Sequence, residues 1–235
     1  MALTILTALF VFASTHDLIR VGKNYDGGYI VANGITYDHI IGGGILDDIS
    51  FEVGMLDRNP GLKADAYDGS VKGLPYPDAR ITFHKTYIGP EAGRSNLHEQ
   101  LKTYKNVMIK MDIEGGEFPW LTNLSDEELN SIAQLVIEFH EVYTPAKWAQ
   151  IARLAKTHKL IHVHGNNCCG TYPMEGIQVP IVFECTFLRN DLEPSTTLNT
   201  KPLPGPLDQP NLKNNRDHNL NYAPFVNPAP AKTEL

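Results

Sequence analysis

The sequence has little cysteine, no excess of basic charge and no long apolar run. Its three cysteines include the adjacent pair Cys168 and Cys169, so they indicate neither a disulfide framework nor a CxxC zinc site. We therefore expect a reducing compartment and a cytoplasmic protein. The net charge of -7 disfavours nucleic acid as a partner, because a phosphate backbone requires a basic face. No run approaches the roughly 20 apolar residues that cross a bilayer, so no membrane span is expected.

The two ends of the chain differ in composition from the middle. Leu3 to Ala13 are apolar, but no Lys or Arg precedes them and no small-x-small cleavage site follows, which favours a packed first helix over a secretory signal. Beyond the last apolar run, Pro, Asn, Lys and Asp dominate, and such a segment cannot offset its ordering entropy by apolar burial. We predict one folded domain, residues 1–190, and an extended or disordered tail, residues 191–235. The aromatic residues of the tail, Phe225 among them, would pin it to its own domain or to the partner in a homodimer.

Short apolar runs rich in β-branched residues recur along the body of the chain. Two helical stretches lie among them: Ser125–Ser131, where Ser125 and Glu128 form a capping box, and Pro145–His158, with Trp148 and other apolar residues at helical spacing. Strands that alternate with helices predict an α/β fold with a mostly parallel sheet, covered by helices on both faces. The loop Gly165–Pro180 has no helical pattern, so the last two strands are predicted to form an antiparallel hairpin at the sheet edge. The seven runs are Tyr37–Ile41, Leu62–Tyr67, Arg80–Tyr87, Val107–Met111, Leu135–Phe139, Leu160–Val163 and Ile181–Leu188.

Glycines directly follow the first of these strands. Gly42, Gly43 and Gly44 lack the Cβ atoms that would keep a bound cofactor from the backbone, and the helix start that follows offers free amide groups. The segment matches neither a Walker loop nor the GxGxxG spacing, and a tight strand-to-helix turn is the alternative explanation. Asp68, at the end of the next strand, lies where doubly wound folds bind ribose hydroxyls. We prefer it to Asp65 because it follows the last residue expected in the sheet.

Three acids, Asp112, Glu114 and Glu117, come after the most apolar strand, where open α/β sheets place their chemistry. Glu138 and His140 end the neighbouring strand, and the alternation of side chains puts both on the same side of it. Asp112, Glu138 and His140 could therefore hold a hard divalent cation such as Mg2+ or Mn2+. The alternative is a hydrogen-bonded polar network without metal.

Two more features bear on a site. His162 and His164 share one face of a later strand. His164 lies nearer the strand end and is a candidate general base, because an imidazole titrates near neutral pH, whereas His162 is expected to be structural. The turn Asp26-Gly27-Gly28 predicts a hairpin, or else a lip over the cofactor or acceptor site.

Four stretches occur in a characteristic order: an Arg-x-Gly then Asp-Gly-Gly-Tyr opening, a Gly-x-Gly then Asp-Asp-x-Ser-Phe-Glu loop, Ala-Tyr-Asp-Gly-Ser, and Lys-Met-Asp-Ile-Glu-Gly-Gly-Glu. From about Arg20 to Leu188 the chain thereby resembles the FkbM-like group of class I S-adenosylmethionine-dependent methyltransferases. The resemblance implies a Rossmann-like, seven-stranded sheet with a reversed last strand. The glycine loop departs from the acid-x-Gly-x-Gly start that is typical of the wider superfamily.

The resemblance also implies a site and an activity. The donor S-adenosyl-L-methionine would lie over Gly42–Gly44, with Asp48 and Ser50 in the same loop, Asp68 on its ribose and Asp112 beyond it. Known members of the group methylate hydroxyl groups, often on sugars or polyketides. The resemblance thus implies an enzyme whose partner is a sugar or glycan acceptor.

These expectations combine into an O-methyltransferase that acts on a sugar hydroxyl of a glycan or of a glycosylated small molecule. His140 or His164 would remove the proton, and a cation on Asp112 and Glu138 would lower the pKa of the hydroxyl. One alternative is a metal-dependent glycosyltransferase, in which Asp112 and Glu114 hold a nucleotide-sugar diphosphate through Mn2+. A second alternative is a non-catalytic, methyltransferase-like binding subunit.

Overall fold

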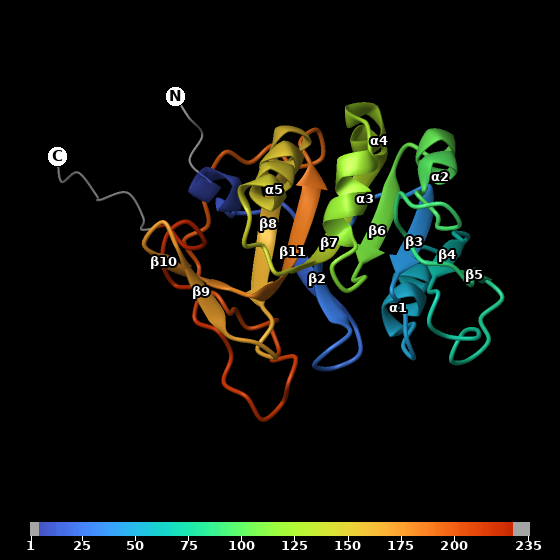
Figure 1. Ribbon diagram of the computed structural model, residues 1–235, viewed down its shortest axis with the longest axis horizontal. Helices are drawn as coiled ribbons and strands as arrows, with labels where there is room; N and C mark the ends of the chain where they lie inside the picture. Colours follow the sequence, from blue (N-terminus) through green and yellow to red (C-terminus); the bar gives the residue numbers. More distant parts are fainter. Residues whose placement is uncertain (1–4, 228–235) are drawn as a thin grey trace.

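One seven-stranded sheet forms the centre of the computed structural model, which describes residues 5–227 (Figure 1). The strand order is β5-β4-β3-β6-β7-β11-β8. Six strands run parallel, and β11 runs antiparallel to both of its neighbours. The predicted α/β fold with a seven-stranded, mostly parallel sheet is confirmed. The strands are β3 (His39–Gly43), β4 (Ala64–Tyr67), β5 (Ile81–His84), β6 (Val107–Met111), β7 (Ile132–His140), β8 (His158–Gly165) and β11 (Val182–Arg189).

The predicted antiparallel pairing of the last two strands at the sheet edge is confirmed, but the reversed strand β11 lies inside the sheet and is not the edge strand. β11 pairs with β7 on one side and with β8 on the other, which makes β8 the edge strand. Seven of the eight residues of β11 are buried, as expected for a strand that is covered on both faces. Between β8 and β11 the chain forms a separate hairpin, β9 (Thr171–Met174) and β10 (Ile177–Pro180), where the sequence indicated only a loop.

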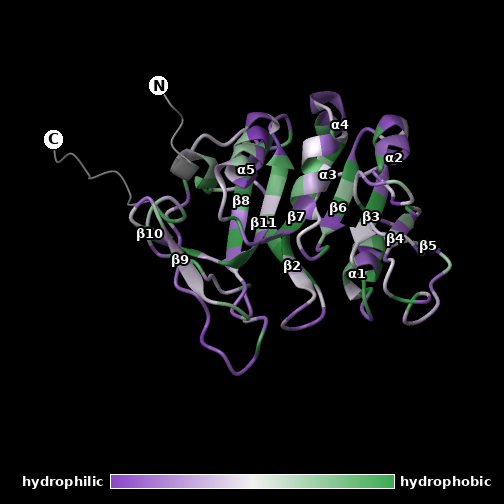
Figure 2. Ribbon diagram, in the orientation of Figure 1, coloured by the Kyte–Doolittle hydropathy of each residue, from purple (hydrophilic) through white to green (hydrophobic). Residues whose placement is uncertain are grey.

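Helices cover both faces of the sheet, as predicted, and a β-hairpin joins them on one face. Neighbouring strand residues point to opposite faces, so Ile40 packs with α1 and Ile41 packs on the side of α3. Figure 2 shows hydrophobic residues concentrated in the strands and hydrophilic residues on the outer turns of the helices and in the loops. One face carries α2 (His98–Thr103), α3 (Glu117–Asn123), α4 (Asp126–Ser131) and α5 (Pro145–Thr157), and the other carries α1 (Ser50–Arg58) with the hairpin of β1 (Leu18–Gly22) and β2 (Gly28–Ala32).

The two helices expected from the sequence begin where their capping residues predict. The hydroxyl of Ser125 accepts a hydrogen bond from the amide of Glu128 at 3.2 Å, and the side chain of Glu128 accepts one from the amide of Ser125 at 2.8 Å. This is the predicted capping box. In α5, Trp148 and Ile151 lie on the buried face. Among the helices of residues 5–227, none combines the length and apolar character needed to cross a membrane.

The tail lies extended over the body from residue 191 to residue 227, and this described part of it contains no helix or strand. Leu203, Leu220 and Phe225 are nevertheless buried in the same apolar cluster as residues of α3 and α5. Phe225 therefore pins the tail to its own domain. The last part of the predicted tail, residues 228–235, lies outside the described residues.

The start of the chain packs beside the tail. A 3-10 helix, η1 (Ile5–Leu9), stands where a packed first helix is predicted, and residues 3 and 4 of that prediction lie outside the described residues. Glu193, which is 0% exposed, accepts hydrogen bonds from the hydroxyl of Ser14 at 2.7 Å and from the amide and hydroxyl of Thr15, both at 3.0 Å. This buried carboxylate therefore links the segment after η1 to the first residues of the tail.

Candidate functional site

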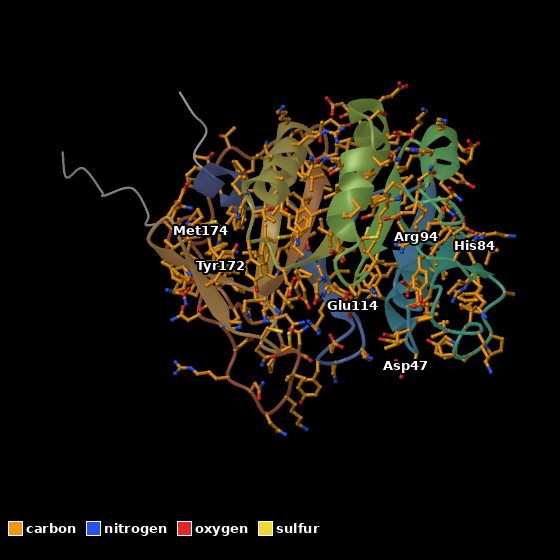
Figure 3. All side chains as sticks on the ribbon, viewed as in Figure 1. Asp47, His84, Arg94, Glu114, Tyr172 and Met174 are labelled. Carbon is orange, nitrogen blue, oxygen red and sulfur yellow. The ribbon has the colours of Figure 1, made fainter. Side chains whose placement is uncertain are left out.

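A cavity of about 260 Å³ lies at the carboxyl ends of β3, β4 and β6, the end at which parallel sheets bind ligands. The turn of the β1–β2 hairpin, with Lys23 and Asp26, forms one wall, so the predicted hairpin also overhangs the cavity. In Figure 3, Asp47 after β3 and Glu114 after β6 lie toward this end of the strands. The acids of the wall are Asp26, Asp47, Asp48, Glu52, Asp68, Asp112 and Glu114.

Of the three glycines after β3, Gly44 lines the cavity, whereas Gly42 and Gly43 do not. A Cβ on Gly42 would lie 2.1 Å from Oε1 of Glu52, and one on Gly43 would lie 2.8 Å from an isoleucine side chain. Gly44 has a φ of +71°, and its Cβ would meet the carbonyl oxygen of Asp112 at 1.6 Å. The predicted contact of a cofactor with Gly42 and Gly43 is therefore not supported, because these two glycines allow close packing on the two faces of β3.

Asp68 faces the cavity at the end of β4. Its Oδ2 accepts a hydrogen bond from the amide of Leu46 at 2.8 Å, and its Oδ1 accepts bonds from the amide and hydroxyl of Ser70 at 2.7 and 2.6 Å. Burial alone would raise the pKa of Asp68, but these hydrogen bonds outweigh it and leave the pKa below its usual value. Asp68 is thus an ionised acceptor in the cavity wall, which is what binding of ribose hydroxyls requires.

A buried carboxylate in the wall, Glu52, was not singled out from the sequence. The residue is 1% exposed, and its Oε1 has no hydrogen-bond partner among the described residues. Burial raises the pKa of Glu52, and the charge of Lys110 opposes the rise. Lys110 donates to the carbonyl oxygen of Gly44 at 2.7 Å, and its Nζ lies 3.8 Å from Oδ2 of Asp112. The sequence signal for both residues is a charge within an otherwise apolar stretch.

Asp48 and Ser50 connect the start of α1 to the hairpin. Asp48 lines the cavity, and its Oδ2 lies 3.2 Å from Nζ of Lys23. The hydroxyl of Ser50 accepts a hydrogen bond from the amide of Lys23 at 2.8 Å, and Ser50 is not part of the wall. Of these two predicted cofactor residues, Asp48 therefore lies in the cavity wall. Ser50 instead binds the β1–β2 hairpin.

Asp112, Glu114 and His140, which we call the acid–histidine cluster, offer one ligand atom each within 4.8 Å of one another. Nε2 of His140 lies 3.5 Å from Oε2 of Glu114, and its Nδ1 lies 3.2 Å from Oε1 of Glu117. Burial would lower the pKa of His140, but the contact with Glu117 and the charges of Asp112 and Glu114 raise it. Because Asp112 and Glu114 also line the cavity, the cluster forms one end of it.

Glu138, the third predicted metal ligand, lies beside the cluster and not within it. It is 4% exposed, and its Oε1 accepts a hydrogen bond from Asn166 at 3.0 Å and lies 3.7 Å from Nε2 of His140. Its Oε2 has no partner in the part of the chain that is described. Burial and the charge of Asp112 raise the pKa of Glu138 well above its usual value. Glu138 and His140 share one side of β7 as predicted, while Glu114 takes the third place in the cluster.

His164, the other predicted base, is enclosed by carboxylates. Its Nδ1 lies 3.3 Å from Oε2 of Glu184, and its Nε2 lies 3.0 Å from both carboxylate oxygens of Asp217. Burial would lower the pKa of His164, but Asp217 and Glu184 raise it to about 10. At neutral pH both ring nitrogens of His164 are therefore protonated and paired, so it cannot act as a general base. Nε2 of His162 pairs with Asp208 at 3.1 Å, away from the cavity wall.

Two comparisons with known proteins give no relative: no family model matches the chain, and no curated protein matches it. What the site can do follows from its own chemistry. The cavity is lined by seven acids, and it ends at a cluster that can take a proton or a cation.

Proposed function

We propose that this protein is an S-adenosylmethionine-dependent O-methyltransferase of the class I fold, which methylates a sugar hydroxyl of a glycan or of a glycosylated small molecule. The observation that carries the proposal is a single cavity that runs from Asp68 after β4 to Asp112 and Glu114 after β6. A donor bound at Asp68 would meet an acceptor at the acid–histidine cluster. The seven-stranded sheet with its last strand reversed supports the class I assignment.

The side chains of the cavity fit the groups of the donor. The carboxylate of Asp68 would accept hydrogen bonds from the ribose hydroxyls. Glu52, which also lines the cavity, would place a carboxyl group near the ammonium of the methionyl group. Leu46 and Tyr87 offer apolar surface for the adenine, and Gly44, which has no Cβ, lets the backbone of Asp112 pack against the end of β3 at the cavity. The bound donor supplies the methyl group, and these residues hold and orient it.

The charge of the cavity favours this donor over a nucleotide sugar. Seven acids line the wall against two lysines, Lys23 and Lys110, and Lys23 is already paired with Asp48. S-adenosylmethionine carries a sulfonium and an ammonium against one carboxylate, so its net charge is positive. A nucleotide sugar carries an anionic diphosphate, which the acidic wall would repel wherever no metal lies between them. The acidic wall therefore suits S-adenosylmethionine by itself, whereas a nucleotide sugar would bind only with a metal on Asp112 and Glu114.

The acid–histidine cluster is the part of the site that would activate the acceptor. An alkyl hydroxyl is a poor nucleophile at neutral pH, so it has to be deprotonated or polarised, whereas an amine needs less help. Glu117 orients the ring of His140, at 3.2 Å from its Nδ1, which leaves Nε2 beside Glu114 at the acceptor end of the cavity. The carboxylates of Asp112 and Glu114 can accept hydrogen bonds from further hydroxyls, such as a sugar provides. Much of the acceleration would then come from positioning the acceptor oxygen in line with the methyl group.

Calorimetric titration with S-adenosylhomocysteine tests the donor site without the acceptor. We expect micromolar binding, and at least a tenfold loss of affinity in Asp68→Ala, because a hydrogen bond to a charged group contributes about 1.5–3 kcal/mol. Glu127→Ala, which removes an exposed acid of α4, is the matched control and should bind like the unaltered protein. Circular dichroism verifies that both variants are folded. If uridine diphosphate glucose binds and S-adenosylhomocysteine does not, the proposal is wrong.

A further inference from the structure

We infer that the acid–histidine cluster binds one divalent cation of the Mn2+ class. The inference deepens the proposed function, because it names the ion that would activate the acceptor at the same site. Asp112 and Glu114 offer carboxylate oxygens and His140 offers an imidazole nitrogen, with one ligand atom from each within 4.8 Å of the others. Carboxylates combined with a single imidazole suit a hard or borderline ion such as Mn2+ and not a soft, thiolate-seeking one.

The orientation of His140 is the one that metal ligands have. Its Nδ1 lies 3.2 Å from Oε1 of Glu117, which leaves Nε2 directed toward Glu114. A histidine that binds a metal through one nitrogen usually donates its other N–H to a carboxylate or a carbonyl. Glu117 is 0% exposed and also accepts hydrogen bonds from the amides of Ile113 and Gly115, at 3.1 and 3.2 Å. One buried carboxylate thus fixes both the ring of His140 and the loop that carries Glu114.

Carboxylate oxygens without partners point to a cation independently of the cluster geometry. Glu138 is 4% exposed, its Oε1 lies 3.7 Å from Nε2 of His140, and within residues 5–227 its Oε2 finds no hydrogen-bond partner. The Oε2 of Glu117 likewise lacks a partner within the described range. Nearly all buried polar atoms are paired with protein groups, water or ions. Glu117 and Glu138, the two buried glutamates beside His140, therefore each have one oxygen without the partner that a nearby cation would supply.

The acids around His140 outnumber the nearby cations. Lys110 lies 3.8 Å from Asp112, and its hydrogen bond goes to the carbonyl oxygen of Gly44. The side chain of Glu114 is 87% exposed, so an ion can reach the cluster from solvent. A divalent ion would remove the like-charge repulsion that burial makes costly. The acids concerned are Asp112, Glu114, Glu117 and Glu138.

The ion would activate the acceptor hydroxyl in the proposed reaction, and it would restrict the kinds of acceptor that fit. Three protein ligands leave open positions on an ion that takes about six. The ion held by Asp112, Glu114 and His140 would lower the pKa of an acceptor hydroxyl beside it, and water would take the proton. The oxygen–carbon bond then forms as the sulfur–carbon bond of the donor breaks, which yields the methyl ether and S-adenosylhomocysteine without oxidation or reduction. A neighbouring hydroxyl fits a second open position, so the acceptor would be a sugar with adjacent hydroxyl groups.

Electron paramagnetic resonance of Mn2+ measures the site without donor or acceptor. When the full chain is titrated with manganese chloride, we expect one bound Mn2+ per chain, with a nitrogen coupling from His140 in the spin-echo spectrum. Glu114→Gln should weaken binding at least tenfold, and His140→Ala should weaken it and remove the nitrogen coupling. Glu127→Gln removes an exposed acid on α4 and is the matched control, which should bind like the unaltered protein.

The variants separate metal binding from folding and from donor binding. The side chain of Glu114 is exposed, so weaker binding in Glu114→Gln does not report unfolding. Glu117→Gln, which weakens the hold on the ring of His140 and on the loop that carries Glu114, should lower the affinity about 10–100-fold and retain the nitrogen coupling. The inference is overturned if no Mn2+ binds at millimolar concentration, or if Glu114→Gln and Glu127→Gln bind alike. If the protein binds S-adenosylhomocysteine but no Mn2+, the metal inference is wrong and the methyltransferase proposal still holds.

Discussion

Gly44→Ala should lower the free energy of unfolding by about 3 kcal/mol and abolish the binding of S-adenosylhomocysteine. The φ of +71° at Gly44 is left-handed, which costs an alanine about 1–2 kcal/mol. The added Cβ would also lie 1.6 Å from the carbonyl oxygen of Asp112, a backbone atom that cannot rotate away. The end of β3 and the loop after β6 would have to separate. Because that loop carries Asp112 and Glu114, the end of the cavity that they form would change.

Gly34→Ala is the matched control for this substitution. Gly34 has a φ of +80°, and no atom of the described residues lies within 4 Å of the position of its Cβ. Gly34→Ala should lower the free energy of unfolding only by the cost of the left-handed backbone, about 1–2 kcal/mol, and leave the affinity for S-adenosylhomocysteine unchanged. Urea denaturation and calorimetry measure the two quantities. Equal losses of stability in the two variants would contradict the close approach of the two loops at Gly44.

The protein should become less stable as the pH rises through about 10, because His164 then loses its proton. Folding raises the pKa of His164 from 6.5 to about 10 through Asp217 and Glu184. A group whose pKa is raised by folding contributes stability that is fully present below the unfolded pKa and is lost as the pH passes the folded pKa. The contribution of His164 to stability is therefore lost between pH 6.5 and about pH 10. At about 1.4 kcal/mol per unit, the loss is roughly 5 kcal/mol as an upper limit.

Urea unfolding at about pH 6, 8 and 10, with His164→Gln beside the unaltered protein, measures this effect. At the lowest pH the variant should be less stable by about 3–5 kcal/mol, because the buried Glu184 and the half-buried Asp217 lose the imidazolium that lies between them. The difference should shrink as the pH rises, since the unaltered protein then loses the same charge. Other groups titrate in both proteins and cancel in the comparison. Parallel stability curves for the two proteins would show that His164 is not an enclosed imidazolium.

Elements that depend on local pattern can be predicted from the sequence, and elements that depend on long-range packing cannot. The apolar run Val107–Met111 predicts β6 with the bounds that the structure has, and the capping box predicts the start of α4. The place of β11 depends on which strand edges are free, and its apolar run fits an edge or an interior strand equally well. Leu203 and Phe225 lie in a segment without periodicity, yet both are buried against the body.

The candidate site divides in the same way. Alternation within β7 correctly puts Glu138 and His140 on one side of the strand. Beyond the end of β6 alternation no longer applies, because Glu114 and Gly115 both have left-handed backbone, with φ of 57° and 94°. That turn brings Glu114 to the cluster, which strand geometry cannot foresee. Asp217, the partner of His164, is 53 residues away in the sequence, and no rule of spacing connects them.

The position of β11 also limits when the sheet can be completed during synthesis of the chain. β7 and β8 leave the ribosome before β11, so each keeps an unpaired edge until residues 182–189 have emerged. The start of the chain waits longer still, because Phe12 bridges to Leu198 and the carbonyl of Val11 accepts its hydrogen bond from the amide of Asn199. The seven-stranded sheet can therefore be completed only late in translation. A chain that ends before β11 would leave one edge of β7 unpaired and β8 without any partner strand, and unpaired strand edges promote aggregation.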